Sequence, residues 1–318
     1  MSPSARAQWC LTAPVRAGAR WLSALSGRKP KKVYPPEPLP EDGGMRPLPL
    51  VIISYNRAAM LRRVIASYRR QTVTVEIVVH DNGSVEPETL ALLDELEREG
   101  IRVFRNAPIS NADVLNRVDE TVSAIFASRE PGPYIVTDSD VELSNSSTET
   151  IATYLRLLNA FPDAECVGPM LRIDDIRKSY PLFGRVMNLH IRQFWRRRPS
   201  VVRIGGLQVA CLRAKFDTTF AVHRTSHAFR RMKAGIRVYA PFDARHLDWY
   251  PHEFAADESP AEQAYRRSSS AAISHWGNEA YRSEFSSERP KYASYHVITR
   301  LPSGRLRLAR RRVADNPD

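Results

Sequence analysis

The sequence predicts an α/β protein with a doubly wound, mostly parallel sheet. Short runs rich in valine and isoleucine alternate with amphipathic segments of helical length from about residue 48 to residue 170. Strands that alternate with helices are typical of right-handed crossovers, which arrange the strands in parallel. One apolar run, 134–137, ends in two acids, Asp138 and Asp140. Because strands of such sheets present their carboxyl ends to a ligand crevice, these acids are expected to face a ligand.

The predicted elements follow one another in a regular order. Strands are expected where β-branched and apolar residues dominate, at 50–53, 75–80, 101–104, 134–137 and 166–168. Helices are expected between these runs, at 57–70, 87–99, 111–128 and 147–160. Gly100 closes the second helix. Beyond about residue 172 the alternation fades, and this part is expected to form a lid on the same sheet.

The net charge of +12 is concentrated at the two ends of the chain. Residues 1–45 carry seven Lys/Arg against three Asp/Glu, and residues 289–318 carry eight against two. The ends therefore hold ten of the twelve net charges, and the body between them is nearly neutral. This distribution argues against a nucleic-acid-binding surface on the body, although either tail could contact phosphates or anionic lipid.

Cysteine usage and hydropathy indicate a cytoplasmic protein, either soluble or peripheral on the inner face of a membrane. Cys10, Cys166 and Cys211 are widely spaced and form no CxxC pair, which argues against a disulfide framework and a zinc site. No run approaches the roughly 20 apolar residues of a membrane-spanning helix, and the N-terminus lacks the apolar stretch of a signal peptide.

Polar motifs follow three of the predicted strands. They are Ser54-Tyr55-Asn56-Arg57 after the first strand, Asp81-Asn82-Gly83-Ser84 after the second, and Asp138-Ser139-Asp140 after the fourth. In a parallel sheet all three loops rise at one edge. Their order and spacing resemble the nucleotide-binding half of GT-A fold glycosyltransferases, family 2 in particular, over about residues 48–170.

The resemblance implies a metal and a nucleotide at this edge. Asp140 would bind Mn²⁺ or Mg²⁺ directly, while Asp138 would reach the ribose, or the metal through a water. Asp81 would accept the imide N–H of uracil, which favours a UDP-sugar as the donor. The residues alone leave two other interpretations open: Asp81 suits a structural turn, and the acidic pair suits a solvated turn.

The first motif is expected to line the base and the phosphates. The resemblance assigns this place to Ser54, Tyr55, Asn56 and Arg57, and the free N–H groups of the helix that starts near Arg57 also favour anions. Asn56 suits a turn or a helix cap as well.

The second half offers a further metal ligand. Metal-dependent GT-A enzymes draw a histidine from this region, so His246 is the first candidate and His275 the second. Imidazole suits Mn²⁺ better than Mg²⁺. A core or surface histidine explains either residue equally well.

A general base is the remaining catalytic group that an inverting transfer needs. The family supplies it downstream of a G-G-F-D-E-like segment, which residues 215–220 match in part. Asp217 is the first candidate for the base or for an acceptor-binding carboxylate, and Asp248 is the second. Asp217 suits a helix cap equally well, and Thr225 and Ser226 stand where the family carries its acidic pair.

The basic aromatic run 194–198, Phe-Trp-Arg-Arg-Arg, also lies in the second half. It could approach a phosphate-bearing acceptor or the donor diphosphate. A solvated basic loop anchored by its two aromatic residues is the structural alternative.

The sequence divides into four parts. A basic, proline-rich leader and linker (1–47) precedes a nucleotide-sugar-binding half (48–172), an acceptor-binding or lid half of the same domain (173–288) and a basic tail (289–318). The predicted function is metal-dependent, inverting transfer of a sugar from a nucleotide-sugar donor to a glycan or lipid-linked acceptor, as in polysaccharide biosynthesis.

Two alternatives to this function remain. A sugar nucleotidyltransferase of similar fold is disfavoured because residues 53–57 lack the glycine of its phosphate loop. A non-enzymatic nucleic-acid-binding protein that uses the basic tails is opposed by the acidic loop 138–142.

Overall fold

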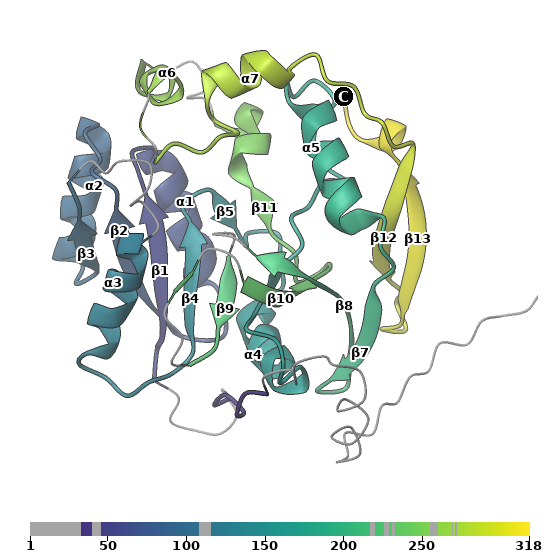
Figure 1. Ribbon diagram of the computed structural model, residues 1–318, viewed down its shortest axis with the longest axis horizontal. Coiled ribbons are helices and arrows are strands. Elements are labelled where there is room, and N and C mark those ends of the chain that lie inside the picture. The colour runs from purple at the N-terminus through teal and green to yellow at the C-terminus, as the bar shows by residue number, and fades with distance from the viewer. Residues whose placement is uncertain are drawn as a thin grey trace, which may run out of the picture.

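The computed structural model describes residues 33–39, 46–107, 116–216, 220–225, 229–230, 233–254, 260–268, 270 and 272–318. At its centre lies a nine-stranded sheet with the order β3-β2-β1-β4-β9-β6-β10-β8-β7, and helices cover both faces (Figure 1). Two small two-stranded sheets, β5 with β11 and β12 with β13, complete the architecture.

The elements of the first half lie close to the positions that the sequence predicts. They are β1 (Leu48–Ser54), α1 (Ala58–Arg69), β2 (Val75–Asp81), α2 (Pro87–Arg98), β3 (Arg102–Arg105), α3 (Asn116–Phe126), β4 (Tyr134–Asp138), β5 (Val141–Glu142), α4 (Thr150–Ala160) and β6 (Cys166–Pro169). The predicted helix start at residue 111 lies outside the described residues.

The second half adds shorter helices and antiparallel strands. They are α5 (Phe183–His190), the π-helix η2 (Ile191–Trp195), β7 (Ser200–Ile204), β8 (Leu207–Phe216), β9 (Ala221–His223), β10 (Lys233–Val238), β11 (Arg245–His246), η3 (Leu247–Trp249), η4 (Pro251–Glu253), α6 (Pro260–Arg267), α7 (Glu279–Phe285), β12 (Ser294–Arg300), β13 (Leu306–Arg312) and η6 (Val313–Asp315).

Strand direction confirms the predicted fold class. β1 pairs in parallel with β2 and β4, β2 with β3, and β6 with β10. β9 runs antiparallel between β4 and β6, and β8 runs antiparallel between β10 and β7, so the sheet is mixed but mostly parallel. The strand order reverses between β1 and β4, and such a switch point opens a ligand crevice beyond the carboxyl ends of the strands.

Strand β1 is apolar over almost its whole length because helices cover both faces of the sheet there. Leu50 and Ile52 of β1 belong to one core with α1, α2 and α4, whereas Val51 and Ile53 belong to a second core with α3. This division explains why β1 shows a continuous apolar run instead of alternating apolar and polar residues.

Strand β10 packs so closely against its neighbours at Gly235 that no side chain fits there. A Cβ atom on Gly235 of β10 would lie 2.6 Å from the carbonyl oxygen of Cys166 and 2.7 Å from the ring of Phe216. Glycine at this position therefore permits β10 to lie beside β6 with the Phe216 ring against it.

Residues 33–39, which the sequence places in the linker, lie against the folded domain. Glu37 accepts a hydrogen bond from the backbone N–H of Thr225 (3.1 Å) and pairs with the guanidinium of Arg224 (3.5 Å). Arg224 is buried and also donates to the carbonyls of Ala164 (2.7 Å) and Leu158. The segment is fixed because its carboxylate compensates a buried charge after β9.

Most of the basic tail predicted at 289–318 forms a β-hairpin in the structure. β12 and β13 pair along their whole length. The ring of Tyr295 is buried against Trp195, with centroids 5.9 Å apart, and the Asn316 amide donates to the carbonyl of Ile173 (2.7 Å). High arginine content obscured two β-prone runs around the glycine-containing turn 301–305.

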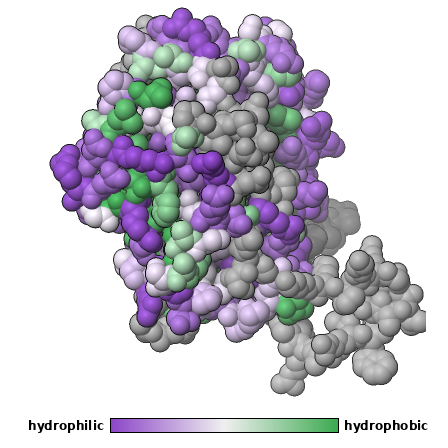
Figure 2. Space-filling model, turned by 60° about the vertical axis from the view of Figure 1, so that its left-hand side comes forward, coloured by the Kyte–Doolittle hydropathy of each residue, from purple (hydrophilic) through white to green (hydrophobic). Residues whose placement is uncertain are grey.

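The side of the molecule that lies opposite the C-terminal hairpin is mainly polar. Figure 2 shows the side of α2 and β3, where hydrophilic side chains predominate and hydrophobic ones form small, separated groups. Among the described residues, no helix combines the length and the apolar content that crossing a bilayer requires.

Replacing Arg224 tests the docking of residues 33–39. We expect Arg224→Ala to lower the free energy of unfolding by about 3–5 kcal/mol, because it leaves Glu37 buried without its counter-charge. Urea denaturation followed by circular dichroism measures the change. Arg230→Ala, which breaks the exposed pair with Glu165, is the control and should cost less than about 1 kcal/mol; equal effects of the two variants would contradict the prediction.

Candidate active site

A short antiparallel ladder joins the acidic motif to the second half of the chain. β5, directly after Asp140, pairs with β11, so that Val141 lies opposite His246. The backbone N–H of Leu247 donates to the carbonyl of Asp140 (2.6 Å) and extends this pairing. Residues more than 100 positions apart in the sequence are thereby held together at the switch point between β1 and β4.

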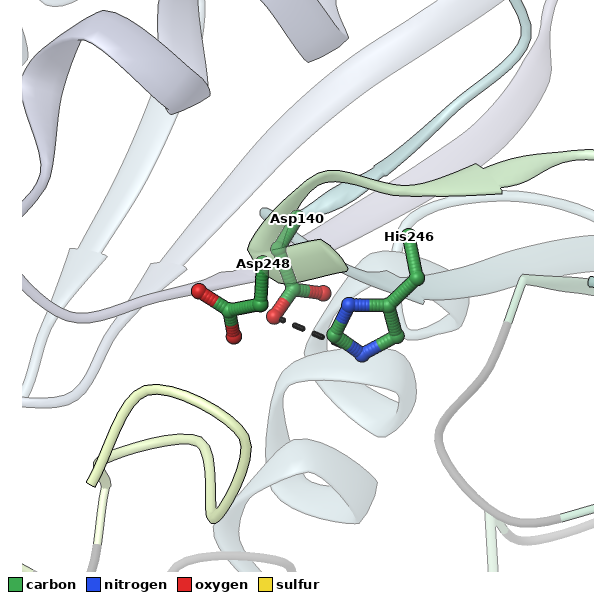
Figure 3. A group of neighbouring side chains, drawn as sticks. All are labelled: Asp140, His246 and Asp248. Atoms are coloured by element: carbon green, nitrogen blue, oxygen red, sulfur yellow. Dashed lines mark ion pairs between the residues drawn. The ribbon is translucent and has the colours of Figure 1, made fainter. Parts of the chain in front are cut away.

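Three side chains converge at the end of this ladder, as Figure 3 shows. One ligand atom from each of Asp140, His246 and Asp248 lies within 4.8 Å of the others, and all three residues are buried. Nε2 of His246 is 3.7 Å from a carboxylate oxygen of Asp140. The ring of Trp249 stacks on His246, with centroids 4.9 Å apart, and so orients the imidazole.

The pKa values of the two carboxylates of the cluster are shifted in opposite directions. Burial raises the pKa of Asp140 to about 6, an effect that His246 and Arg57 oppose and Asp248 reinforces. Burial also disfavours the charge on Asp248, but Arg57 and His246 outweigh this, so the pKa of Asp248 lies well below its usual value. Asp248 therefore carries a fixed negative charge in the cluster.

Arg57 is the cation next to this cluster. Its guanidinium lies 2.6 Å from Asp248 and makes two contacts of 3.2 Å with Glu262 of α6. The ring of Tyr265, also on α6, lies 4.5 Å from the guanidinium carbon. Arg57 thus joins the start of α1 to an element about 200 residues later in the chain.

The backbone of the first motif is unusual at this point. Asn56 and Arg57 both adopt the left-handed conformation, with φ of 52° and 62°. The side chain of Asn56 holds this turn, because its oxygen accepts from the N–H groups of Val85 (3.0 Å) and Glu86 (3.1 Å). The turn directs Arg57 to Asp248.

The second motif is a hydrogen-bonded turn in the structure. Asp81 accepts hydrogen bonds from the N–H groups of Gly83 (3.2 Å) and Ser84 (2.9 Å) and from the Ser84 hydroxyl. The backbone N–H of Asn56 donates to the same hydroxyl (2.7 Å). Asp81 therefore ties the loops after β1 and β2 together.

A charge network centred on the buried Glu142 lies next to the cluster. The carboxylate of Glu142, on β5, accepts two hydrogen bonds from Arg63 of α1 (2.6 and 2.7 Å) and one from Arg245 of β11 (3.3 Å). Glu253 pairs with both of these arginines. The network fixes both strands of the ladder to α1.

The structure brings together some of the predicted site residues and separates others. Asp140 and His246 meet in the cluster. Asp138 is half-buried at the end of β4 and is not part of it. His275 packs on Trp276, with centroids 4.6 Å apart, outside the cluster.

The other predicted site residues lie partly inside the cluster, partly outside it and partly outside the described residues. Asp248, predicted as an alternative base, joins the cluster. Asp217 lies outside the described residues. Ser54 has a buried hydroxyl without a hydrogen-bond partner among the described residues, and Tyr55 faces Tyr265, with ring centroids 6.1 Å apart. Sequence reasoning missed the contacts of Arg57 with Glu262 and Tyr265, because no local pattern links positions so far apart.

The donor set of the cluster fits a divalent cation. Oδ1 of Asp140 and Nδ1 of His246 are buried without a hydrogen-bond partner among the described residues, and such orphaned polar atoms are costly. Two carboxylates and one imidazole are ligands that suit Mn²⁺, and a cation would offset their mutual repulsion.

Residues 50–108 match the protein family described as Glycosyl transferase family 2. The matched stretch contains β1, β2 and the turns that hold Arg57 and Asp81. The resemblance predicted from the motifs is thus confirmed over this stretch of the chain. No curated protein sequence matches the chain.

Several solved structures are similar to the chain. The mannosyltransferase PcManGT from Pyrobaculum calidifontis, in complex with GDP-Man and Mn²⁺, shares 18% identity at a TM-score of 0.35, over 64% of this chain and 50% of that one. S. aureus TarS 1-349 shares 11% identity at a TM-score of 0.37, over 76% of this chain and 70% of that one.

A third structure, glucosyl-3-phosphoglycerate synthase from Mycobacterium tuberculosis with phosphoglyceric acid, shares 18% identity at a TM-score of 0.27, over 48% of this chain and 53% of that one. This chain therefore spans about half the length of the mannosyltransferase and of the synthase. At such scores the likenesses carry no argument about the donor or acceptor of this chain.

Metal binding distinguishes the two candidate histidines. We expect His246→Ala to weaken Mn²⁺ binding at least about tenfold, because it removes a ligand from the cluster. Electron paramagnetic resonance of free Mn²⁺ measures this affinity. His275→Ala is the matched control and should bind as the wild type does; weaker binding in this variant alone would contradict the assignment.

Removing the buried carboxylate of Glu142, next to the cluster, should destabilise the protein. We expect Glu142→Ala to lower the free energy of unfolding by about 3–5 kcal/mol, because Arg63 and Arg245 lose their buried partner. Urea denaturation measures the loss. Glu95→Ala breaks an exposed pair with Arg62 and should change the stability far less; an equally small loss for Glu142→Ala would show that the network does not support the ladder.

Proposed function

We propose that this protein is a metal-dependent glycosyltransferase that moves a sugar from a nucleoside diphosphate, with UDP favoured, to a hydroxyl of a glycan or lipid-linked acceptor. The observation that supports this most is the cluster of Asp140, His246 and Asp248. It lies beside Arg57 at the switch point between β1 and β4, which is where open α/β sheets bind their ligands.

The ligands of the metal would be Asp140, His246 and Asp248. A bound Mn²⁺ or Mg²⁺ supplies Lewis-acid stabilisation of the departing diphosphate. Arg57, 2.6 Å from Asp248, would place a second positive charge beside the same phosphates. Asp138, half-buried at the end of β4, would contact the ribose.

Base recognition is assigned to the loop that contains Asp81. A carboxylate offers about four lone-pair directions, and the turn uses three of them. The remaining one can accept the imide N–H of uracil, which is the physical basis for favouring UDP. The turn also fixes the carboxylate, so that a base meets an oriented acceptor.

The general base is assigned to Asp217, on the segment after β8. Asp248 suits this role less, because Arg57 stabilises its ionised form and lowers its proton affinity. An inverting transfer requires the base on the face of the sugar opposite the leaving diphosphate.

Nucleotide binding tests the proposal. Calorimetric titration with UDP, GDP, CDP and ADP, with and without Mn²⁺, should show Mn²⁺-dependent preference for UDP. We expect Asp140→Ala to weaken UDP binding at least about tenfold in Mn²⁺, since it removes a metal ligand. Asp94→Ala, at an exposed position on α2, is the control and should leave binding unchanged.

The reaction product separates transfer from nucleotidyl synthesis. Release of free UDP from a UDP-sugar supports the proposal, whereas release of pyrophosphate from a nucleoside triphosphate would replace it with a nucleotidyltransferase. Absence of metal-dependent binding of any of the four nucleotides would refute the assignment of the cluster.

A further inference from the structure

Two segments of the second half are strongly basic and contain no acids. Residues 191–216 carry seven Lys/Arg and no Asp/Glu, and residues 289–314 carry eight and none. They include η2, β7 and β8 in the first segment and the β12–β13 hairpin in the second. In the sequence they are about 70 residues apart.

The fold joins these two segments along one side of the molecule. The guanidinium of Arg300 donates to the carbonyl of Gln208 (2.8 Å), and the Gln208 side chain accepts from the N–H of Leu306 (2.9 Å). Arg196 lies over the ring of Tyr292 at 5.2 Å. Figure 1 shows β12 and β13 next to β7, at the end of the sheet. We call this surface, formed by residues 191–216 and 289–314, the basic edge.

Several arginines of the basic edge are free to meet an external anion. Some are neutralised within the protein: Arg213 pairs with Asp163 (2.8 Å) and Arg312 with Asp315 (2.8 Å). Others are exposed and make no ion pair within the described part of the chain, namely Arg192, Arg198, Arg203, Arg305, Arg307 and Arg310. A positive field of this extent favours an anionic partner.

Exposed aliphatic residues occur on the same two β-hairpins as most of these arginines. Val201, Leu207 and Leu308 are 44%, 45% and 43% exposed, and they are three of the five large hydrophobic residues that are exposed in the described part of the chain. Leu207 follows the Gly205-Gly206 turn of the β7–β8 hairpin, and Leu308 lies on β13.

We propose that the basic edge docks on an anionic lipid surface, with the arginines at the head groups and the aliphatic side chains at the acyl boundary. Basic residues interspersed with exposed aliphatic ones are the combination that binds such an interface. A surface for single-stranded nucleic acid would expose aromatic rings for stacking, whereas Trp195 and Tyr295 of this edge are buried. The half-buried rings of Phe194 and Tyr292 lie against Arg237 and Arg196, respectively. The inference goes beyond the proposed transferase activity and does not rest on it.

Vesicle binding of the full-length protein tests the inference. The intact chain should co-sediment with vesicles that contain phosphatidylglycerol and stay in solution with pure phosphatidylcholine. We expect the triple variant Arg203→Glu, Arg307→Glu and Arg310→Glu to partition at least about tenfold more weakly, because every basic side chain at an anionic surface adds to the attraction. The basic leader is unchanged in this comparison.

Two further variants separate the effect of where the charges lie from the effect of the exposed leucines. The control Arg62→Glu, Arg69→Glu and Arg98→Glu makes the same charge change on α1 and α2, and it should bind vesicles as the wild type does. Leu207→Ser with Leu308→Ser should weaken vesicle binding without any charge change, while binding to heparin stays the same.

The outcomes distinguish a lipid surface from another polyanion and from an unspecific effect of net charge. Equal loss in the basic-edge and control variants would overturn the inference in favour of net charge alone. Vesicle binding that survives both leucine substitutions, together with strong binding to heparin or DNA that the arginine variant loses, would replace the lipid surface with a polyanion. Thermal melting of each variant, unchanged from the wild type, excludes unfolding as the cause.

Discussion

The pairing of β5 with β11 is the constraint on which the candidate active site depends. A carboxylate from the first half and an imidazole from the second must lie within a few ångströms, although more than 100 residues separate them. The short ladder achieves this through backbone hydrogen bonds, and the N–H of Leu247 extends it to the carbonyl of Asp140. Side-chain placement then follows from the register, because Val141 lies opposite His246.

Charge compensation keeps this ladder in place. Two groups of ion pairs lie next to it: Arg57 with Asp248 and Glu262, and Glu142 with Arg63 and Arg245. Each buried charge has a partner of opposite sign, as the cost of desolvation requires. The cluster of Asp140, His246 and Asp248 brings two carboxylates together with one imidazole, and a divalent cation would offset this excess of negative charge.

In the first half, the helices and strands of the structure lie close to their predicted positions for a simple physical reason. Each element there forms from local signals, namely β-branched runs for strands and helical spacing between them, and the parallel connections follow from their alternation. The C-terminal hairpin had local signals too, in two β-prone runs around a glycine turn, but the density of arginine concealed them. Its Tyr295 is anchored on Trp195, a contact across about 100 residues that no local pattern announces.

The sequence by itself determined the α/β fold class, the strand-end motifs and the candidate ligands Asp140 and His246, because these depend on residue type and on spacing along one stretch of chain. Only the tertiary structure decided which acids meet. It excluded Asp138 from the cluster, brought in Asp248, tied Arg57 to Glu262 and joined two basic segments into one edge. Such contacts depend on how distant segments pack and on the compensation of buried charge, and neither is written in any local pattern.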